Sequence, residues 1–501
     1  MPKFKQIILP SLLILVIASV IRFTNLNSLP IFADESIYVR WAQVMRAESS
    51  LRFLPLSDGK QPLFMWAVIP FFKIFSDPLI AGRVLSGLCG LATTLGIFFA
   101  AQILFKKTSL SVLAAFIWAI IPYSVFFERM ALVDSMLTMF VIWTFVFSAL
   151  GIIHARLDFS MFAGFSLGFA YLTKSPAVFS FLLIPTLLLL IDLKHKSTIQ
   201  KLQLVGQIIT TYIIALGMYN ILRLGPEFHM LASRTKDYFY PLAEVLKHPW
   251  WPLFPHLVDN LTFLGYLMTP VASSLSIWGI FADKFAHWRG RIILSLWWLV
   301  PLMAQSAVAI SLTARYFLYT LPFAVILLAH GLLHLKQKLK NPVLSWLLLG
   351  LILIPAVVID FMFIYKVESA PLPRIERAGY LEQWTAGTGL KQVSEIIKSF
   401  AIAGPVLVGS EGFFGTPFDG LGVYLNKVPN VRIVGVGVWI DSVHEKLSNS
   451  LADNQVFLVV NSTRFHADPA KLGLKLLGSY PKAVSPDGSQ ETLLFFQVLP
   501  R

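Results

Sequence analysis

The sequence has few charged residues and a single cysteine. Charged side chains make up 14% of its 501 residues and hydrophobic ones 56%, whereas soluble domains carry about 25% charged residues. This shortage of charge excludes an ordinary soluble protein and indicates a chain that crosses a membrane several times. Cys89 alone excludes a disulfide framework and a cysteine zinc site. Internal repeats and low-complexity segments are also lacking.

Acidic residues are fewer than basic ones, with 27 Asp and Glu against 41 Lys and Arg and a formal net charge of +14. Such a balance could indicate nucleic-acid binding. However, about half of the basic residues fall in short loops between apolar runs, and no basic stripe with interleaved aromatic residues is present. We therefore interpret the excess positive charge as a signal of membrane topology and expect no nucleic-acid partner.

Apolar runs recur along the first 365 residues. A helix needs roughly 20 apolar residues to cross the hydrocarbon core of a bilayer. The runs predict about eleven transmembrane helices, the second preceded by a shorter leading helix, at Ile7–Phe23, Phe64–Leu104, Leu110–Phe127, Leu137–Ile153, Phe159–Leu172, Ala177–Ile191, Leu204–Leu222, Leu261–Phe281, Ile292–Leu312, Tyr316–Leu335 and Val343–Tyr365.

The loops between these runs alternate in charge. Short cytoplasmic loops are enriched in Lys and Arg, and every second loop here is basic, at Lys3 and Lys5, Lys106 and Lys107, His154 and Arg156, Lys194 to Lys201, Lys284 to Arg291, and Lys336 to Lys340. The pattern predicts a cytoplasmic N-terminus. The first run has no small-x-small cleavage site after it, so we expect an uncleaved anchor. An odd number of crossings then places the segment after Lys366 outside. We expect the membrane to be the plasma membrane of a prokaryote.

The composition changes after Tyr365. Short β-branched runs at Val406–Val408, Val431–Val438, Val456–Val460 and Leu493–Val498 predict strands, and Leu390–Phe400, Ser442–Leu451 and Ala470–Leu477 are compatible with helices. We therefore predict two domains, a polytopic all-α membrane domain at 1–365 and a small extracytoplasmic α/β domain at 366–501.

Acidic and basic residues gather at the predicted outer ends of the spans. Charged groups at a membrane are costly and indicate a functional site by default. Each also has a structural interpretation: Arg40 and Lys60 as interfacial residues, Glu128 and Arg129 as a local pair, and Asp134 as a helix cap. The candidates are Asp34, Glu35, Arg40, Lys60, Arg83, Glu128, Arg129, Asp134, Lys174 and Arg315.

Several short motifs, taken in order, resemble a known enzyme group. They are Asp34-Glu35 with Tyr38, Lys60-Gln61-Pro62-Leu63 before Trp66, Arg129 with Asp134-Ser135-Met136-Leu137, Leu172-Thr173-Lys174-Ser175-Pro176, and Arg315-Tyr316. Over about residues 1–365, this order is similar to the membrane glycosyltransferases of the protein O-mannosyltransferase and aminoarabinose-transferase group, which have the GT-C fold. The sequence departs from the pattern at Ile37, where the aminoarabinose type has a basic residue, and at Gln61, where many relatives have proline.

The resemblance implies inverting transfer of a hexose or pentose from a polyprenyl-phosphate carrier to an extracytoplasmic protein, lipid or glycan. It implies that Asp34 is the catalytic base, with Glu35 and Asp134 as further carboxylates of the catalytic set. It also implies that the donor phosphate is bound by cations, namely Arg40, Lys60, Arg129, Lys174 and Arg315. No nucleotide is needed, and a divalent metal, Mg²⁺ or Mn²⁺, at the first two acids stays open because oxygen ligands suit these ions.

Two other classes of function remain as alternatives. A multi-pass transporter or lipid flippase should show repeated halves or charges at mid-span, and this chain shows neither clearly. An inactive scaffold that binds partners through the C-terminal domain would not need the acidic motifs. The sequence thus favours the transferase.

Overall fold

The computed structural model describes residues 2–283, 287–339 and 341–500. Lys284 and Lys340, two of the basic residues used for the topology, lie outside the described residues. The chain forms two compact units. The helical unit consists of Met1–Asn25, Ser50–Phe64 and Arg83–Tyr365, and the α/β unit of Leu26–Ser49, Met65–Gly82 and Lys366–Arg501.

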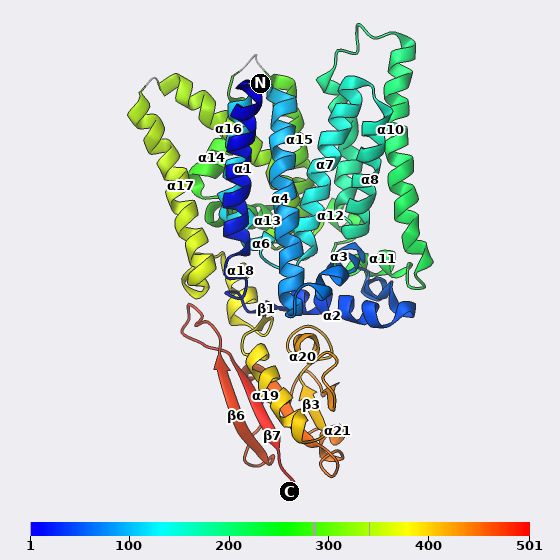
Figure 1. Cartoon of the computed structure of the whole chain (residues 1–501), viewed down its shortest axis with the longest axis vertical. Coiled ribbons are helices and arrows are strands. Elements are labelled where there is room, and N and C mark those ends of the chain that lie inside the picture. The colour runs from blue at the N-terminus through cyan, green and yellow to red at the C-terminus, as the bar shows by residue number, and fades with distance from the viewer. Residues whose placement is uncertain (1, 284–286, 340, 501) are drawn as a thin grey trace. The chain divides into compact units, whose positions relative to one another are not determined.

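The helical unit is built from apolar helices, several of which run alongside one another in Figure 1. Six helices in the described ranges are long and apolar enough to cross a membrane, or up to eight if each of two bent pairs counts as one span. This confirms a multi-pass membrane protein, while the finer number of eleven spans stays a prediction. Long helices of the described residues are α1 (Pro2–Phe23), α4 (Pro78–Phe105), α7 (Val133–His154), α8 (Leu157–Thr173), α10 (Thr198–Tyr219), α13 (Trp250–Leu267), α15 (Trp288–Val308), α16 (Leu321–Leu339) and α17 (Pro342–Tyr365).

Prolines break two of the expected runs into bent pairs. Helix α5 (Thr108–Ile120) meets α6 (Pro122–Glu128) at a bend of 55°, and α13 (Trp250–Leu267) meets α14 (Pro270–Phe281) at a bend of 115°. A proline lacks the N–H of a helix interior and disfavours helical backbone in the residue before it, so each helix ends before the proline. The segment Ala232–Asn260, which precedes the predicted span at Leu261–Phe281, also contains helical residues.

Shorter helical segments connect the long ones. They are η2 (Leu54–Asp58), α3 (Leu63–Val68), η3 (Ile69–Lys73), α9 (Ala177–Leu183), η4 (Ile184–Leu190), η5 (Asn220–Leu224), α11 (Met230–Ser233), η6 (Arg234–Asp237), α12 (Leu242–Lys247) and η7 (Ala314–Thr320).

Glycines let neighbouring helices of the membrane unit approach closely. A Cβ on Gly279 of α14 would lie 2.0 Å from the backbone oxygen of Leu327 in α16, and one on Gly164 of α8 would lie 2.9 Å from the backbone oxygen of Thr211 in α10. Because lipid tails are as apolar as the side chains, helices in a membrane associate through such close packing. The absence of side chains at Gly164 and Gly279 therefore determines which helix faces meet.

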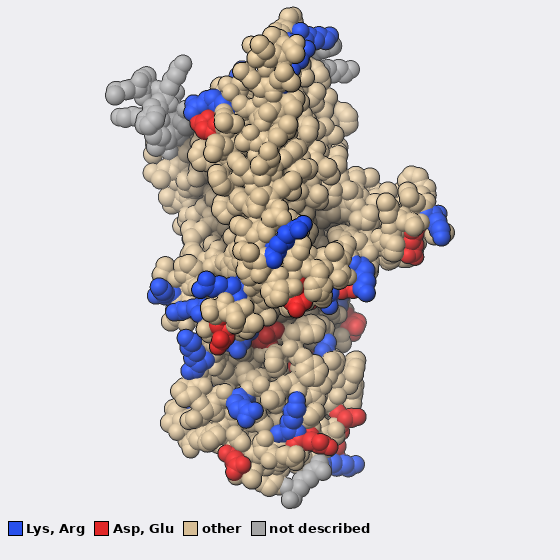
Figure 2. All heavy atoms as spheres, turned by 90° about the vertical axis from the view of Figure 1, so that its right-hand side faces the viewer, with Lys and Arg blue, Asp and Glu red and all other residues tan. Residues whose placement is uncertain are grey.

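The lipid-facing character of the unit is visible on its surface. Figure 2 shows one face on which the helices present a broad area of uncharged side chains. Large exposed apolar residues of α10 include Ile199, Val205, Ile209, Ile213 and Leu216. An apolar surface of this extent is expected for a protein whose solvent is the bilayer.

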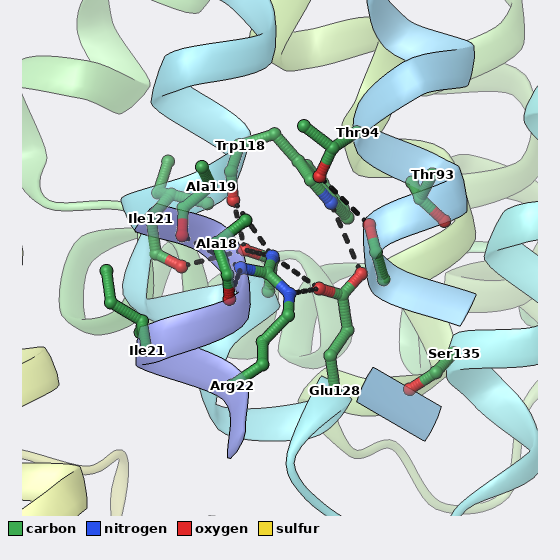
Figure 3. A network of polar contacts seen from close by, with 12 residues as sticks. Ala18, Ile21, Arg22, Thr93, Thr94, Trp118, Ala119, Ile121, Glu128 and Ser135 are labelled. Carbon is green, nitrogen blue, oxygen red and sulfur yellow. Dashed lines mark hydrogen bonds and ion pairs between the residues drawn. The ribbon is translucent and has the colours of Figure 1, made fainter. Parts of the chain in front are cut away.

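A buried ion pair links the first helix to the α5–α6 bend. The Arg22 guanidinium lies 2.5 Å from the Glu128 carboxylate, and both side chains are fully buried. Figure 3 shows this pair, with Nη1 of Arg22 donating to the Ala119 carbonyl and the Trp118 indole N–H donating to Glu128. A buried charge must be paired and hydrogen-bonded to be tolerated. Glu128 therefore pairs with α1 rather than with neighbouring Arg129.

The α/β unit contains a five-stranded sheet of order β4-β3-β5-β7-β6. Strands β3 (Val406–Ser410), β4 (Val431–Gly435) and β5 (Gln455–Asn461) are parallel, and β7 (Thr492–Val498) and β6 (Leu474–Pro481) extend the sheet antiparallel. Helix α19 (Leu390–Ala403) lies over the strands in Figure 1. The remaining helices after residue 365 are η8 (Val367–Ser369), α18 (Arg374–Arg377), η9 (Ala378–Glu382), α20 (Phe418–Tyr424), α21 (Glu445–Ser448) and η10 (Ser462–Arg464).

The predicted strands and the helix at 390–400 are confirmed. The helical interpretation of Ala470–Leu477 is wrong, because β6 begins at Leu474 and pairs with β7. Earlier segments also belong to this unit: β1 (Ile31–Phe32) pairs with β2 (Ala386–Gly387), and α2 (Ala33–Ala47) packs on α20. Met65–Gly82, which includes η3, belongs to it as well, whereas η1 (Ser49–Leu51) lies where the chain passes into the helical unit.

Candidate active site

The helical unit brings together two charged residues that are 40 positions apart in the sequence. Nζ of Lys174 lies 2.6 Å from Oδ1 of Asp134. Asp134 is in the first turn of α7, where the positive end of the helix dipole favours a carboxylate. Lys174 follows the last residue of α8 and has an extended backbone before the turn that contains Pro176. Helix packing between α7 and α8 therefore produces the pair.

The ion pair with Lys174 involves only one of the two carboxylate oxygens of Asp134. Its side chain is 3% exposed, whereas the Lys174 side chain is 22% exposed. Oδ2 of Asp134 is buried and has no hydrogen-bond partner in the described part of the chain. A buried acceptor left without a donor is costly, and such exceptions occur where a substrate completes the site. The unpartnered Oδ2 thus marks Asp134 as a candidate site residue.

An aromatic ring places a second cation beside Lys174. Nζ of Lys174 lies 4.4 Å from the ring centre of Tyr316, and the Arg315 guanidinium carbon lies 5.4 Å from the same centre. Arg315 and Tyr316 belong to η7. This segment is fixed to α6 by a hydrogen bond from the Tyr123 hydroxyl to the Ala314 carbonyl. Two cations on one ring form a positively charged site that suits an anion such as phosphate.

The loop that carries Lys60 reaches the same turn. Nε2 of Gln61 donates a 2.7 Å hydrogen bond to Oγ of Ser175, the residue after Lys174. Lys60 itself forms an ion pair of 3.0 Å with Asp58, and Asp58 also contacts Arg234. The structure therefore brings the Lys60 and Lys174 segments side by side. The resemblance assigns both lysines to binding of the donor phosphate.

Arg129, the residue that follows α6, contacts the C-terminal end of α1. Its Nη1 donates to the carbonyls of Ile21 and Thr24 at 2.6 and 2.8 Å, and its Nη2 donates to the carbonyl of Asn25 at 3.0 Å. Carbonyls at a helix C-terminus lack intrahelical donors and carry partial negative charge. These contacts show how Arg129 secures α1. Its role in phosphate binding stays a prediction.

Three of the predicted site residues, Asp34, Glu35 and Arg40, belong to the α/β unit, whereas Arg83 is fully buried in the helical unit. Asp34 and Glu35 are in the first turn of α2. The Glu35 carboxylate is fully buried and accepts a 3.0 Å hydrogen bond from the backbone N–H of Phe32, as in one half of a capping box. Nη1 of Arg40 donates to Oδ1 of Asn426 at 3.0 Å, so this cation ties α2 to the loop after α20.

A buried carboxylate lies close enough to Arg40 to be influenced by its charge. Burial raises the pKa of Asp419 to about 6, while a hydrogen bond from the Gly415 N–H and the charge of Arg40 act in the opposite direction. The net direction shows that desolvation outweighs these stabilising contacts. Asp419 therefore titrates near neutral pH.

Comparisons with known proteins identify the fold. Residues 59–219 match the family model described as dolichyl-phosphate-mannose-protein mannosyltransferase. No curated protein matches the sequence. The structure of ArnT from Cupriavidus metallidurans bound to undecaprenyl phosphate is similar over 98% of this chain and 99% of that chain, with a TM-score of 0.60 and 13% identity.

The apo form of the same ArnT is similar over 100% of both chains, with a TM-score of 0.59 and 13% identity. The Archaeoglobus fulgidus oligosaccharyltransferase is similar over 96% of this chain and 72% of that chain, with a TM-score of 0.50 and 12% identity. The chain has a GT-C glycosyltransferase fold. This confirms the resemblance predicted from the motifs.

Within this GT-C fold, the region that matches the family model contains four of the eight residues to which the resemblance assigns a role. Lys60, Arg129, Asp134 and Lys174 lie inside residues 59–219, and Asp34, Glu35, Arg40 and Arg315 lie outside them.

Sequence reasoning missed buried charges within two apolar runs. Asp360 of α17 is 3% exposed, and neither of its carboxylate oxygens has a hydrogen-bond partner among the described residues. Arg22, near the end of the first apolar run, is also fully buried. A lone acid inside an apolar run is the signal that could have identified Asp360, because an intramembrane charge is a functional-site hypothesis by default.

Residues 2–283, 287–339 and 341–500 contain no group of three or more His, Cys, Asp or Glu placed to hold a metal ion.

Proposed function

We propose that the protein transfers a sugar, with inversion, from a polyprenyl-phosphate carrier to an extracytoplasmic acceptor. The observation that carries this proposal is the half-used Asp134 carboxylate beside Lys174, Tyr316 and Arg315 in a GT-C fold. The similar ArnT structure contains undecaprenyl phosphate, which supports a lipid phosphate as the leaving group. The fold favours this assignment over a transporter or flippase.

The reaction needs alignment, charge compensation and removal of one proton. An acceptor oxygen or nitrogen attacks the anomeric carbon from the face opposite the phosphate, so a bond to the acceptor forms while the bond to the phosphate oxygen breaks. The electron pair of the broken bond remains on the lipid phosphate. Cations at Lys174 and Arg315 compensate this charge, which is where preorganised electrostatics lower the barrier most.

A carboxylate receives the acceptor proton. By resemblance we assign this role to Asp34, with Glu35 and Asp134 as the other carboxylates of the catalytic set, and we assign further phosphate binding to Arg40, Lys60 and Arg129. General-base catalysis of this kind contributes typically 10²–10⁴-fold. The contacts of Asp134 support a role in holding Lys174 and in orienting the acceptor.

We further propose that the N-terminus is cytoplasmic, that residues 366–501 form an extracytoplasmic domain, and that the membrane is the plasma membrane of a prokaryote. The alternating basic loops support this orientation. Cysteines introduced at exposed positions can test it with a membrane-impermeant maleimide in intact cells, because the natural Cys89 is buried. Labelling at Lys475 but not at Lys194 is expected, and the reverse would invert the topology.

Transfer of radiolabelled sugar tests the function directly. The full-length protein in nanodiscs is supplied with polyprenyl phosphates that carry defined hexoses or pentoses, and with protein, lipid or glycan acceptors. We expect transfer from one donor class, an inverted anomeric centre in the product, and a loss of at least 100-fold in Asp34→Asn. Asp192→Asn, in an exposed loop, is the matched control. Full activity of Asp34→Asn would refute its assignment as the base.

A further inference from the structure

A cavity of about 490 Å³ lies within the α/β unit, and none of the residues assigned to the transfer reaction lines it. Its walls come from the end of α2, the segment that leads into α4, one side of α19 and the loop after α20. All of these segments belong to one compact unit, so the cavity is a feature of that unit alone.

The cavity is positively charged. Four cations and two acids line it, which leaves two positive charges. The acids are occupied: Asp77 pairs with Lys391 at 2.6 Å, and Glu395 pairs with Lys398 at 2.7 Å. The other two cations are Arg46 and Lys427, and neither has an ion-pair partner within the described ranges. A neighbouring cavity of about 530 Å³ in the same unit has Lys391 as its sole cation beside two acids and is therefore negative.

The uncharged part of the wall includes three aromatic side chains and the first residue of a helix long and apolar enough to cross a membrane. Phe72, Phe75 and Tyr424 line the cavity, and so does Pro78, the first residue of the membrane-spanning helix α4. The cavity therefore lies where this helix begins. Aromatic side chains are typical of the interface between bilayer and water, and cations at that level attract anionic lipid headgroups.

We propose that this cavity binds the phosphate headgroup of an anionic membrane lipid, with Arg46 and Lys427 as its direct partners. Lys391 and Lys398 maintain the positive field, and the aromatic side chains contact the glycerol region of the lipid. Because the wall of the cavity continues along the chain into α4, we assign a lipid rather than a soluble phosphate compound. This inference does not depend on the transferase assignment.

Binding of short-chain lipids to the full-length protein tests the proposal. The protein in an uncharged detergent is titrated with dihexanoyl-phosphatidylglycerol and, separately, with dihexanoyl-phosphatidylcholine, and heat release is measured. The test variant is Arg46→Gln with Lys427→Gln. The control variant is Arg432→Gln with Lys475→Gln, which removes the same charge from exposed strand positions of the same unit. Inorganic phosphate serves as a soluble competitor.

The wild type is expected to bind phosphatidylglycerol more tightly than phosphatidylcholine. The test variant should weaken phosphatidylglycerol binding by roughly 30-fold, from the contribution of two cations near a headgroup, while the control variant should change it less than threefold. Equal binding of the two lipids, or equal losses in both variants, would overturn the site. Inorganic phosphate that binds as tightly as phosphatidylglycerol would overturn the assignment to a lipid.

Discussion

Substitution of Gly90 by alanine should destabilise the helical unit. Gly90 lies on α4 against the buried ion pair, and a Cβ there would lie 2.3 Å from Oε2 of Glu128 and 2.7 Å from Nε of Arg22. No real Cβ has such contacts, so the carboxylate must move away from the guanidinium. Breaking a buried pair costs about 3–5 kcal/mol, and the better helix propensity of alanine returns at most about 1 kcal/mol. The net loss is about 2–4 kcal/mol.

Thermal unfolding of the purified protein measures this loss. Tryptophan fluorescence reports the helical unit, and a thiol-reactive dye reports exposure of Cys89, which is 3% exposed in the folded state. We expect a Tm lower by about 2–4 °C, because a chain of 501 residues has a large unfolding entropy. Gly206→Ala in α10 is the matched control, because no atom lies within 4 Å of its added Cβ. A Gly90→Ala protein as stable as this control would refute the reasoning.

Three further predictions concern packing, titration and metal ions. Gly279→Ala should lower the free energy of unfolding by about 1–3 kcal/mol, because its Cβ overlaps the Leu327 carbonyl. Gly265→Ala is the control and should leave stability unchanged, because no atom lies within 4 Å of its Cβ. Equal Tm values for the two variants would contradict this packing. Because the pKa of Asp419 is raised to about 6, its folded form binds a proton more readily than its unfolded form, and stability falls as pH rises from about 4 to 6, by about 2 kcal/mol after allowance for partial exposure. Asp419→Asn should remove this part of the difference in Tm between pH 4 and pH 7; an unchanged difference would refute the assignment. Chelation by EDTA should leave sugar transfer within about twofold of its rate, because protein cations compensate the phosphate charge; loss of transfer that Mg²⁺ restores would contradict this.

Much of the fold could be predicted because each helix and strand has a local pattern. Apolar length predicts the spans, and β-branched runs flanked by turn residues predict β3, β4 and β5. The bends at Pro122 and Pro270 were missed because apolar length carries no information on direction, although the prolines could have indicated them. The error at Ala470–Leu477 has a similar origin, since its apolar spacing fits a helix and pairing with β7 decides the matter.

The site could be predicted only in part, because its contacts join distant positions. Motif order and shared sidedness predict only that Asp134 and Lys174 belong to one site, and the structure shows that the two side chains are in contact. By contrast, Glu128 contacts Arg22 across 106 positions, and sequence spacing alone would pair Glu128 with its neighbour Arg129. Such long-range partners depend on helix packing, which no local pattern encodes.

The central claim is that Lys174 and Asp134 act on a lipid-linked sugar donor, and steady-state transfer kinetics test it most directly. Purified wild type, Lys174→Gln, Asp134→Asn and the exposed control Lys475→Gln are compared with one polyprenyl-phosphate sugar. The account predicts kcat/KM values at least 100-fold lower for the first two variants and unchanged for the control. Wild-type rates in Lys174→Gln, in a protein with unchanged Tm, would contradict it.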